Sequence, residues 1–469
     1  MSSEWKKYTI ADVSKKVITG KTPPGTLDKY FDGEVLFVTP TDMGDNKYIE
    51  LTQRTLSDEG GAKLAKQKFE CGIVVSCIGW QMGKAAIVRN VAVTNQQINT
   101  IIPNSDLMVT DFLYYILSNK RSEIFNLGAT ATRTPILKKS LFEKIEFYAP
   151  KLEQQKKIAS ILSCLDHKII NNQKINQTLE QMAQALFKSW FVDFEPVKAK
   201  MAVLETGGSQ EDATFAAMTA ISGKDTDTLA VFEREHPEQY AELKTTAELF
   251  PSAMQESELG AIPVGWNISN IKDNVDVRDG THASPKASDS GYHLVTSKNI
   301  TSGYLDRRSC YYISDMDYHE VNKRSQVSCG DILISMIGTV GALYFVAENN
   351  VDYAIKNIGL IRTSERQDLQ AFIFYHLKSN NGVNYINSRL AGTTQKYLSL
   401  KQLREIPIVM PTQDVLAAFN KKIFLHEIHA NQEITETLAN IRDTLLPKLL
   451  SGEITLPEAE QAVSEAENV

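Results

Sequence analysis

Two glycine-lysine pairs are the residues of this chain that come nearest to a nucleotide-binding motif. A phosphate-binding P-loop requires Gly-x-x-x-x-Gly-Lys followed by Ser or Thr, so that backbone N–H groups and the lysine surround the phosphates. Gly20-Lys-Thr22 has Lys15 where the first glycine belongs, and Gly83-Lys84 is followed by Ala85. Both patterns are incomplete, and the sequence predicts that this chain binds no nucleotide.

The other combinations of reactive residues are also incomplete. An amino-methyltransferase is expected to carry Asp or Asn before Pro-Pro and an aromatic residue, but the one Pro-Pro pair, Pro23-Pro24, lies between Thr22 and Gly25. His426 and His429 have helical i, i+3 spacing and could hold a metal. No third ligand lies nearby in sequence, however, which favours two exposed helix histidines. We therefore expect no catalytic residue, metal or cofactor in this chain.

The elements that must position any functional residue occur twice. The two halves of the chain repeat with an offset of 257 to 261 residues over most of their length. The clearest match pairs Cys71–Gly79 with Cys329–Gly338, each a turn, a β-branched strand and a closing glycine. Each copy opens near a tryptophan, Trp5 or Trp266. The repeat predicts two copies of one domain of mixed sheet and helix, spanning 1–150 and 263–411.

Behind each copy, apolar residues recur every three or four positions, the pattern of a long helix with one apolar seam. The predicted helices span 151–196 and 412–452, and Pro447 and Gly452 are expected to end the second. At 1.5 Å per residue they would reach about 60 and 50 Å. Rods of that length overhang a domain roughly 30 Å across, which favours an antiparallel coiled coil over two helices that pack separately on their own domains. Asn172 and Asn176 would be its polar seam residues.

These elements together predict the fold class. We expect a duplicated α/β (α+β) protein whose two domains of mixed sheet and helix are separated by two long antiparallel coiled-coil helices with pseudo-two-fold symmetry.

Two acidic segments lie outside the repeat. Residues 197–262 are predicted to be a connector with a short helix around 226–249 and no periodic core of its own, and 453–469 to be an acidic, disordered tail. The net charge of the chain is −7, but 205–258 carry −9 and 453–469 carry −5, which leaves +7 elsewhere. The acidic total therefore does not exclude a nucleic-acid partner, whose phosphates attract Lys and Arg.

Length and composition indicate a globular protein with more than one core. The chain has 469 residues, of which 42% are hydrophobic. Its start lacks the apolar core of a signal peptide, and no run of eighteen apolar residues could span a bilayer. We expect a soluble, cytoplasmic protein.

The order domain, helix, domain, helix resembles the DNA-specificity subunits of bacterial type I restriction-modification enzymes, and the resemblance covers almost the whole chain. The segments most similar to the family's central shared region are Pro150–Ala159, Leu165–Ile169, Leu179-Glu180 and Leu186–Pro196. Ser257–Trp266 looks like the usual start of the second recognition domain, and Leu445–Glu453 like the distal shared region. The second helix departs from the first, because Pro411-Thr-Gln-Asp-Val415 stands where the first has a Glu-Gln-Gln sequence.

The resemblance implies a division of labour. Residues 1–150 and 263–411 would be target-recognition domains, each reading one half of a bipartite, asymmetric DNA site. The helices would set the half-site spacing and bind two adenine-methylating subunits, with which ATP-driven restriction subunits assemble. S-adenosylmethionine, ATP and Mg would then be bound only by the partner subunits, and this chain would be non-catalytic.

The DNA contacts that we expect are polar or aromatic loop residues able to meet base edges or phosphates. In the first domain they are Lys21, Thr22, Asp42, Trp80, Gln81, Lys84, Gln96, Gln97, Thr132 and Arg133. In the second they are Thr281, His282, Lys298, Asn299, Thr339, Lys356, Asn357, Thr393, Gln395 and Lys396. The residues expected to dock the partner subunits are Gln154, Gln155, Asp166, Leu186, Phe187, Trp190, Phe191, Leu446 and Leu449.

Two alternatives stay open at the level of sequence. The chain could be a coiled-coil scaffold whose duplicated domains bind proteins instead of DNA, or an enzyme whose active site matches no known motif. Mapping N6-methyladenine in a host that expresses the chain with its methyltransferase would distinguish the scaffold from a DNA-recognition protein. Activity of the purified chain alone would favour the enzyme.

Overall fold

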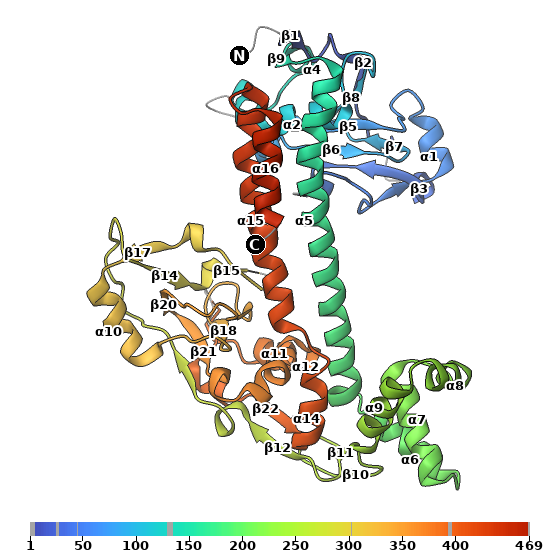
Figure 1. Ribbon diagram of the computed structural model, residues 1–469, viewed down its shortest axis with the longest axis vertical. Helices are drawn as coiled ribbons and strands as arrows, with labels where there is room; N and C mark the ends of the chain where they lie inside the picture. The colour runs from blue at the N-terminus through green and yellow to red at the C-terminus, as the bar shows by residue number, and fades with distance from the viewer. Residues whose placement is uncertain are drawn as a thin grey trace. The chain divides into compact units, whose positions relative to one another are not determined.

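The computed structural model describes residues 5–24, 28–44, 46–128, 135–301, 303–392 and 396–467. The chain forms two compact units, one made of residues 1–174 and 431–469 and the other of residues 175–430 (Figure 1). Within the described residues, every helix is too short or too polar to cross a lipid bilayer.

The first unit contains a four-stranded antiparallel sheet in the order β2-β8-β5-β6 and a three-stranded sheet in the order β4-β3-β7. In the smaller sheet, β3 pairs parallel with β7 and antiparallel with β4. The bounds are β2 Ser14–Thr19, β3 Phe31–Val38, β4 Thr55–Leu56, β5 Gly72–Ser76, β6 Ala85–Val88, β7 Ala92–Thr94 and β8 Ile98–Pro103, and β1 Lys6–Thr9 pairs with β9 Glu146–Ala149. Short helices complete the unit, namely α1 Asp58–Lys63, α2 Thr110–Asn119, α3 Arg121–Gly128 and α4 Lys139–Phe142.

The second unit repeats this topology. Its four-stranded sheet has the order β13-β21-β18-β19 and its three-stranded sheet the order β17-β14-β20, again with one parallel pair, β14 with β20. The bounds are β12 Asn267–Asn270, β13 Val277–Asp279, β14 Tyr292–Thr296, β17 Tyr311–Ile313, β18 Ile332–Ser335, β19 Leu343–Phe345, β20 Tyr353–Lys356, β21 Ile358–Ile361 and β22 Pro407–Met410, and β12 pairs with β22. Two further pairs of two-residue strands are β10 Met254–Gln255 with β11 Ile262–Pro263 and β15 Ile300–Thr301 with β16 Tyr304–Leu305. The helices are α10 Asp315–Ser325, α11 Gln370–Lys378, α12 Asn380–Ser388 and α13 Leu400–Arg404.

The matching strand orders confirm the predicted duplication and the predicted class of mixed sheet and helix. The two strands singled out in the sequence, β5 and β18, are both central strands of their sheets, and every residue of each is buried. β-Branched residues dominate them because a strand covered on both faces needs no polar side.

The predicted long helices are present, with different ends. The first helix, α5, spans Leu152–Phe187 and continues as one turn of π-helix, η4, over Lys188–Val192. Phe194 then adopts a left-handed conformation (φ 54°), which ends the helix before residue 196. The second predicted helix is two helices, α14 Gln413–Asn420 and α15 Leu425–Ser451.

Two features of the second helix correct the sequence interpretation. α14 ends early because Phe419 is buried in the core of the second unit and Asn420 donates a hydrogen bond to the carbonyl oxygen of Asp368 (2.7 Å). Pro447 was expected to stop the helix, yet it lies inside α15. The helix tolerates the loss of one backbone N–H there and ends at Gly452, whose φ of +70° is a left-handed conformation that glycine adopts without strain.

Within each unit a hydrogen bond joins α5 to α15. In the first unit Arg442 Nη1 donates to Asp166 Oδ1 (2.9 Å), and in the second Asn176 Nδ2 donates to the carbonyl oxygen of Ile428 (2.7 Å). Asn176 is one of the two polar seam residues, Asn172 and Asn176, that the sequence predicted.

The segment predicted to be a connector without a core is a helical module. It contains α6 Glu195–Glu205, α7 Gln210–Ser222, α8 Thr226–Glu235 and α9 Pro237–Glu248. Its core is spread over three short helices, which gives no long apolar period in sequence. The buried members are Ala217, Met218, Leu229, Leu243 and Ala247.

The predicted disordered tail is also a helix, α16, over Leu456–Glu467. Ala459 and Val463 are buried in the core of the first unit. Thr455 precedes the helix, and its backbone N–H and hydroxyl both donate to the carboxylate of Glu458 (2.6 and 2.9 Å), the glutamate half of a capping box. The Thr-x-x-Glu spacing was a helix-start signal that acidic composition obscured.

Candidate nucleic-acid interface

The loop after β2 and the loop after β7 meet in the first unit. Gly20 packs so closely on this second loop that a Cβ atom would lie 2.2 Å from the carbonyl oxygens of Thr94 and Asn95. The N–H of Lys21 donates to Thr94 O (2.8 Å), and Thr22 Oγ1 donates to Gln96 Oε1 (2.7 Å). The structure thus gathers three of the predicted contact residues, all with exposed side chains, at one place. Gln97, half-buried, follows directly and is bonded to Asn95 through its N–H (3.0 Å).

The same two loops meet in the second unit. A Cβ atom on Gly280 would lie 2.4 Å from Ile355 O, and the N–H of Thr281 donates to that oxygen (3.0 Å). His282 Nδ1 lies 3.0 Å from Asn357 Oδ1, the counterpart of the contact between Thr22 and Gln96. Lys356 Nζ donates to Ser284 Oγ (2.6 Å). Thr281, His282, Lys356 and Asn357 therefore form a second cluster at the equivalent strand ends.

The turns after β3 and β14 contain the predicted residues Asp42 and Asn299. Each accepts hydrogen bonds from the backbone N–H and the hydroxyl of a threonine three residues earlier, Thr39 or Thr296. Asp42 is half-buried and also accepts from the N–H of Gln53 (2.8 Å).

Asn299 cannot contact DNA in this structure. It is fully buried and donates from Nδ2 to Ser309 Oγ (2.9 Å), so that its prediction as a DNA contact is wrong. The Thr-x-x-Asn spacing, a capping pattern, would have identified its structural role. The neighbouring Lys298 is exposed.

The turns after β5 and β18 differ between the units. In the first, Trp80 lies on a 3-10 turn, η3 (Gly79–Gln81), is 86% exposed, and stacks on Phe125 with ring centroids 6.2 Å apart. Gln81 is half-buried, and Lys84 Nζ donates to the carbonyl oxygens of Met43 and Gly44 (3.3 and 3.4 Å).

The second unit has an exposed threonine, Thr339, in place of the tryptophan. Lys396 is exposed beside Tyr397, which pairs with Ala391 through two backbone hydrogen bonds. The remaining predicted contacts, Thr132, Arg133, Thr393 and Gln395, lie outside the described residues.

A buried lysine that sequence reasoning missed anchors the loop behind Asp42. Lys47 is 3% exposed, and its Nζ lies 2.6 Å from Asp111 Oδ1, 2.7 Å from Ser163 Oγ and 3.1 Å from Tyr115 OH. Burial lowers the pKa of Lys47, and the carboxylate of Asp111 opposes this effect. A lysine in a polar loop is normally exposed, so nothing local signalled this link between the first domain and α5.

Most of the predicted partner-docking residues are buried in the chain's own cores, which contradicts their assignment. Phe187, Trp190 and Phe191 belong to the core of the second unit, and Asp166 and Leu449 are 4% and 2% exposed in the first. Gln155, 1% exposed, donates from Nε2 to Pro150 O (2.8 Å) and accepts from the N–H of Val109 (3.0 Å). The apolar stripe of a long helix indicates that its residues are buried, but it does not show whether the chain's own core or a partner subunit covers them. Gln154, Leu186 and Leu446 are half-buried and stay predictions.

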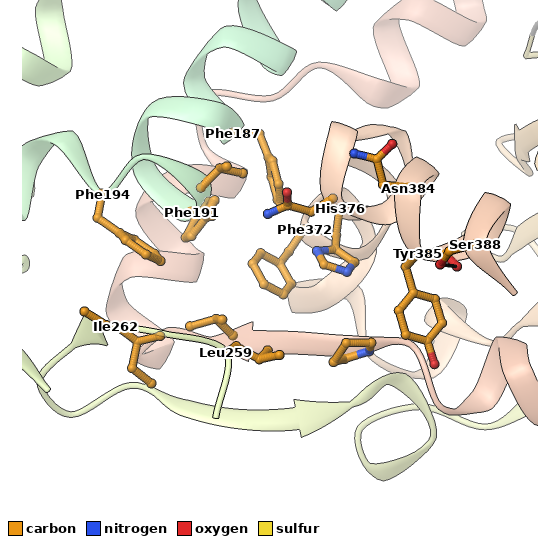
Figure 2. A pocket seen from close by; sticks show the side chains of 15 residues that line it. Phe187, Phe191, Phe194, Leu259, Ile262, Phe372, His376, Asn384, Tyr385 and Ser388 are labelled. Carbon is orange, nitrogen blue, oxygen red and sulfur yellow. Dashed lines mark hydrogen bonds between the residues drawn. The ribbon is translucent and has the colours of Figure 1, made fainter. Parts of the chain in front are cut away.

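The aromatic residues at the end of α5 line a pocket in the second unit. Figure 2 shows Phe187, Phe191 and Phe194 facing Phe372 and His376 of α11, around a cavity of about 510 Å³. Burial lowers the pKa of His376 to about 4, so its imidazole is neutral at neutral pH.

Of the two helix histidines predicted to be exposed, His426 is exposed and His429 is buried. His429 is 9% exposed, and its ring lies edge-on to Tyr344 with centroids 5.1 Å apart, while His426 lies edge-on to Phe345 at 5.3 Å. The two histidines pack on aromatic rings of β19. Across the part of the chain with described coordinates, no group of three or more potential ligands gathers at one place.

One topology built twice, with polar loops at equivalent strand ends and two long helices, defines a protein with two recognition modules. The chain belongs to the family of type I restriction-modification DNA specificity subunits, because residues 2–181 and 263–444 each match the type I restriction modification DNA specificity domain.

Known relatives agree over the full length. The specificity subunit of the type I restriction enzyme HindI from Haemophilus influenzae is 30% identical, with 96% of this chain and all of the relative aligned. The MjaIX specificity subunit from Methanocaldococcus jannaschii is 25% identical over 97% of this chain and 94% of its own. In fold, the chain is similar to the crystal structure of the S subunit of a type I restriction-modification system from M. genitalium, with a TM-score of 0.51, 13% identity and coverage of 95% and 96%.

Proposed function

We propose that this chain reads a bipartite, asymmetric DNA site, with one half-site for each recognition domain. The observation that carries the proposal is the pair of equivalent loop clusters, Thr22 with Gln96 and His282 with Asn357. Both present side-chain hydrogen-bonding groups of the kind that read base edges. Because the side chains differ at equivalent positions, the two domains would prefer different half-sites.

The long helices would set the gap between the half-sites and dock two methyltransferase subunits. Support comes from a stripe on α5 that stays uncovered within the second unit. Ile175 and Met182 are 40% and 61% exposed, and Leu179 and Leu186 are half-buried, at the 4-3-4 spacing of a coiled-coil seam. A partner helix with its own apolar seam would bury this stripe.

Catalysis would belong to the partners. The methyltransferase subunits would bind S-adenosylmethionine and methylate adenine, and restriction subunits using ATP and Mg would join through the complex of methyltransferase and specificity subunits. This chain would determine which DNA sequence the complex recognises, and it would act in the cytoplasm beside genomic DNA.

Mapping N6-methyladenine tests the proposal. The chain is co-expressed with its neighbouring methyltransferase in a host lacking both, and methylated positions are determined across the genome. We expect one split motif that disappears when this chain is omitted. A methylome that is the same with and without the chain would contradict DNA recognition and favour a protein-binding scaffold.

A further inference from the structure

Strand β2 forms one edge of the four-stranded sheet in the first recognition domain and leads into the loop that carries Thr22. Near the start of this strand Lys16 is exposed, and its Nζ donates to the carbonyl oxygen of Lys66 in the segment behind α1 (3.2 Å). Lys66 is exposed as well, and so is Lys15, the extra residue at a β-bulge of β2. These three lysines, which we call the basic edge, bring three positive charges to one border of the domain.

The basic edge has no counter-charge of its own. Across the described part of the chain, no carboxylate lies within ion-pair distance of Lys15, Lys16 or Lys66. Positive charges that gather at one border repel one another, so this arrangement gives the fold no electrostatic stabilisation. It does create a positive potential at the surface, which attracts an anionic partner.

The second domain has the same edge strand with a different charge. In β13, Val277 corresponds to Val17 of β2, because each pairs with an isoleucine of the neighbouring strand, β21 or β8. The two carbonyl oxygens also accept the same kind of hydrogen bond, from a cation of α13 or α4 (2.7 Å in each). By this register Asp276 stands in the second domain where the first has Lys16.

Carboxylates neutralise the cations at the edge of the second domain. Arg278 on β13 donates from Nη1 to the carbonyl oxygen of Arg324 (2.8 Å), the same kind of contact that links the strand and the helix segment in the basic edge. Arg278 Nε also pairs with Asp276 Oδ2 (2.7 Å), and Arg324 pairs with the buried carboxylate of Asp279. The charge is therefore balanced at this edge and uncompensated at the edge of the first domain.

The phosphates of a DNA backbone fit the basic edge. The ammonium group of lysine is a compact point charge, and a contact to phosphate carries no sequence information. Lys16 precedes Thr22 by six residues, which span at most about 20 Å at 3.3 Å per residue. One DNA strand covers that length in about six base pairs. The basic edge can therefore lie beside the backbone close to the bases that the loop reads.

We propose that the basic edge binds the phosphate backbone beside the first half-site and supplies affinity that depends on salt but not on sequence. The second domain contributes less of this affinity, because the cations at its edge are already paired with carboxylates. The inference rests on the proposed function. It adds a backbone-binding surface and an unequal division of electrostatic affinity between the two recognition domains.

The test measures how the complex of this chain with its methyltransferase binds a labelled duplex that carries the methylated motif. Fluorescence anisotropy gives the affinity at salt concentrations from about 50 to 200 mM. The test variant combines Lys15→Gln, Lys16→Gln and Lys66→Gln. Each phosphate contact contributes about 0.9 to the slope of log affinity against log salt concentration, so the slope should become shallower by about 2 to 3. Binding at about 100 mM salt should weaken at least about 10-fold, with the methylated motif unchanged.

Two comparisons separate local contact from total charge. Lys198→Gln, Arg234→Gln and Lys244→Gln together remove the same charge from exposed positions of the helical module and should leave the slope as it is. The second comparison sets Arg278→Gln against Lys16→Gln alone. Because a carboxylate already neutralises Arg278, its loss should change the slope by less than half as much as the loss of Lys16 does.

Each result bears on a different part of the inference. A split motif with an unchanged slope in the test variant, or an equal change in the helical-module variant, would overturn the inference and leave the proposed function standing. A changed base preference in the test variant would also overturn it, because phosphate contacts carry no sequence information. Equal slope changes in Arg278→Gln and Lys16→Gln would refute the unequal division. A wild-type complex without any split motif would remove the proposed function and this inference together.

Discussion

Arg442 on α15 donates a hydrogen bond from Nη1 to Oδ1 of Asp166 on α5 across 2.9 Å. The other oxygen of the same carboxylate accepts from the hydroxyl of Tyr115 on α2. One buried carboxylate thus joins both long helices and the recognition domain within the first unit. Burial, and then the negative charge of Asp166, raise the pKa of Tyr115 far above its ordinary value, so the phenol stays protonated and remains a donor.

Replacing this carboxylate should cost much more stability than replacing a surface charge. Asp166→Ala leaves the Tyr115 hydroxyl without its carboxylate acceptor in a buried site and leaves Arg442 paired only with Asp443 (2.8 Å), and we expect a loss of about 3 kcal/mol in the free energy of unfolding. The matched control is Lys157→Ala, which removes an exposed pair with Glu153 at 3.6 Å and should cost at most about 1 kcal/mol. Denaturant titration measures both, and equal losses would contradict the buried junction.

A methyl group at Gly280 should disturb the second loop cluster. The Cβ atom of Gly280→Ala would lie 2.4 Å from Ile355 O, so the loop carrying Asn357 must move. We expect a loss of about 1–3 kcal/mol in stability and weakened selection of the second half-site only. Gly44→Ala, where nothing lies within 4 Å of the added atom, is the control and should keep both half-sites. Methylome mapping compares the two variants. The same methylated motif in both would contradict the prediction that close packing at Gly280 positions the loop.

A charge in the exposed stripe of α5 should weaken partner docking without unfolding the chain. Met182 is 61% exposed, so Met182→Lys costs little in the isolated chain but would bury an ammonium group against a partner helix. We expect the methyltransferase to bind at least about 10-fold more weakly, which corresponds to about 1.4 kcal/mol. Gln177→Lys adds the same charge at another exposed position of α5 and should bind normally. Co-purification and calorimetric titration measure the difference, and equal affinities would place the docking surface elsewhere.

The buried histidine of the second unit should make stability depend on pH. Burial lowers the pKa of His376 from 6.5 to about 4. Between those values the unfolded chain binds a proton that the folded chain excludes, so stability falls as pH drops from 6.5 towards 4. His376→Phe should remove this part of the decline, whereas His319→Phe, at an exposed position of α10, should retain it. Unfolding curves at pH 7 and pH 5 test this. If the free energy of unfolding falls equally in wild type and His376→Phe, groups other than His376 cause the loss of stability in acid.

The sequence located the recognition loops but did not show which of their polar residues are exposed. The repeat of strands and closing glycines located the loops that carry Thr22 and Gln96, His282 and Asn357, because turn residues have local signatures. It did not distinguish an exposed polar residue from a capping one, as Asn299 shows, because that depends on what the surrounding chain covers. Lys47 went unnoticed for the same reason.

The amino-acid sequence by itself determined the duplication, the mixed domains and the long helices, because hydrophobic period and turn chemistry act over a few neighbouring residues. The tertiary structure decided which side chains are covered and which distant groups meet. It buried Trp190, assembled a core from three short helices of the acidic segment, and brought His282 to Asn357 across 75 residues of chain. Such contacts form only when elements distant in sequence pack together, so the local spacing of apolar residues does not predict them.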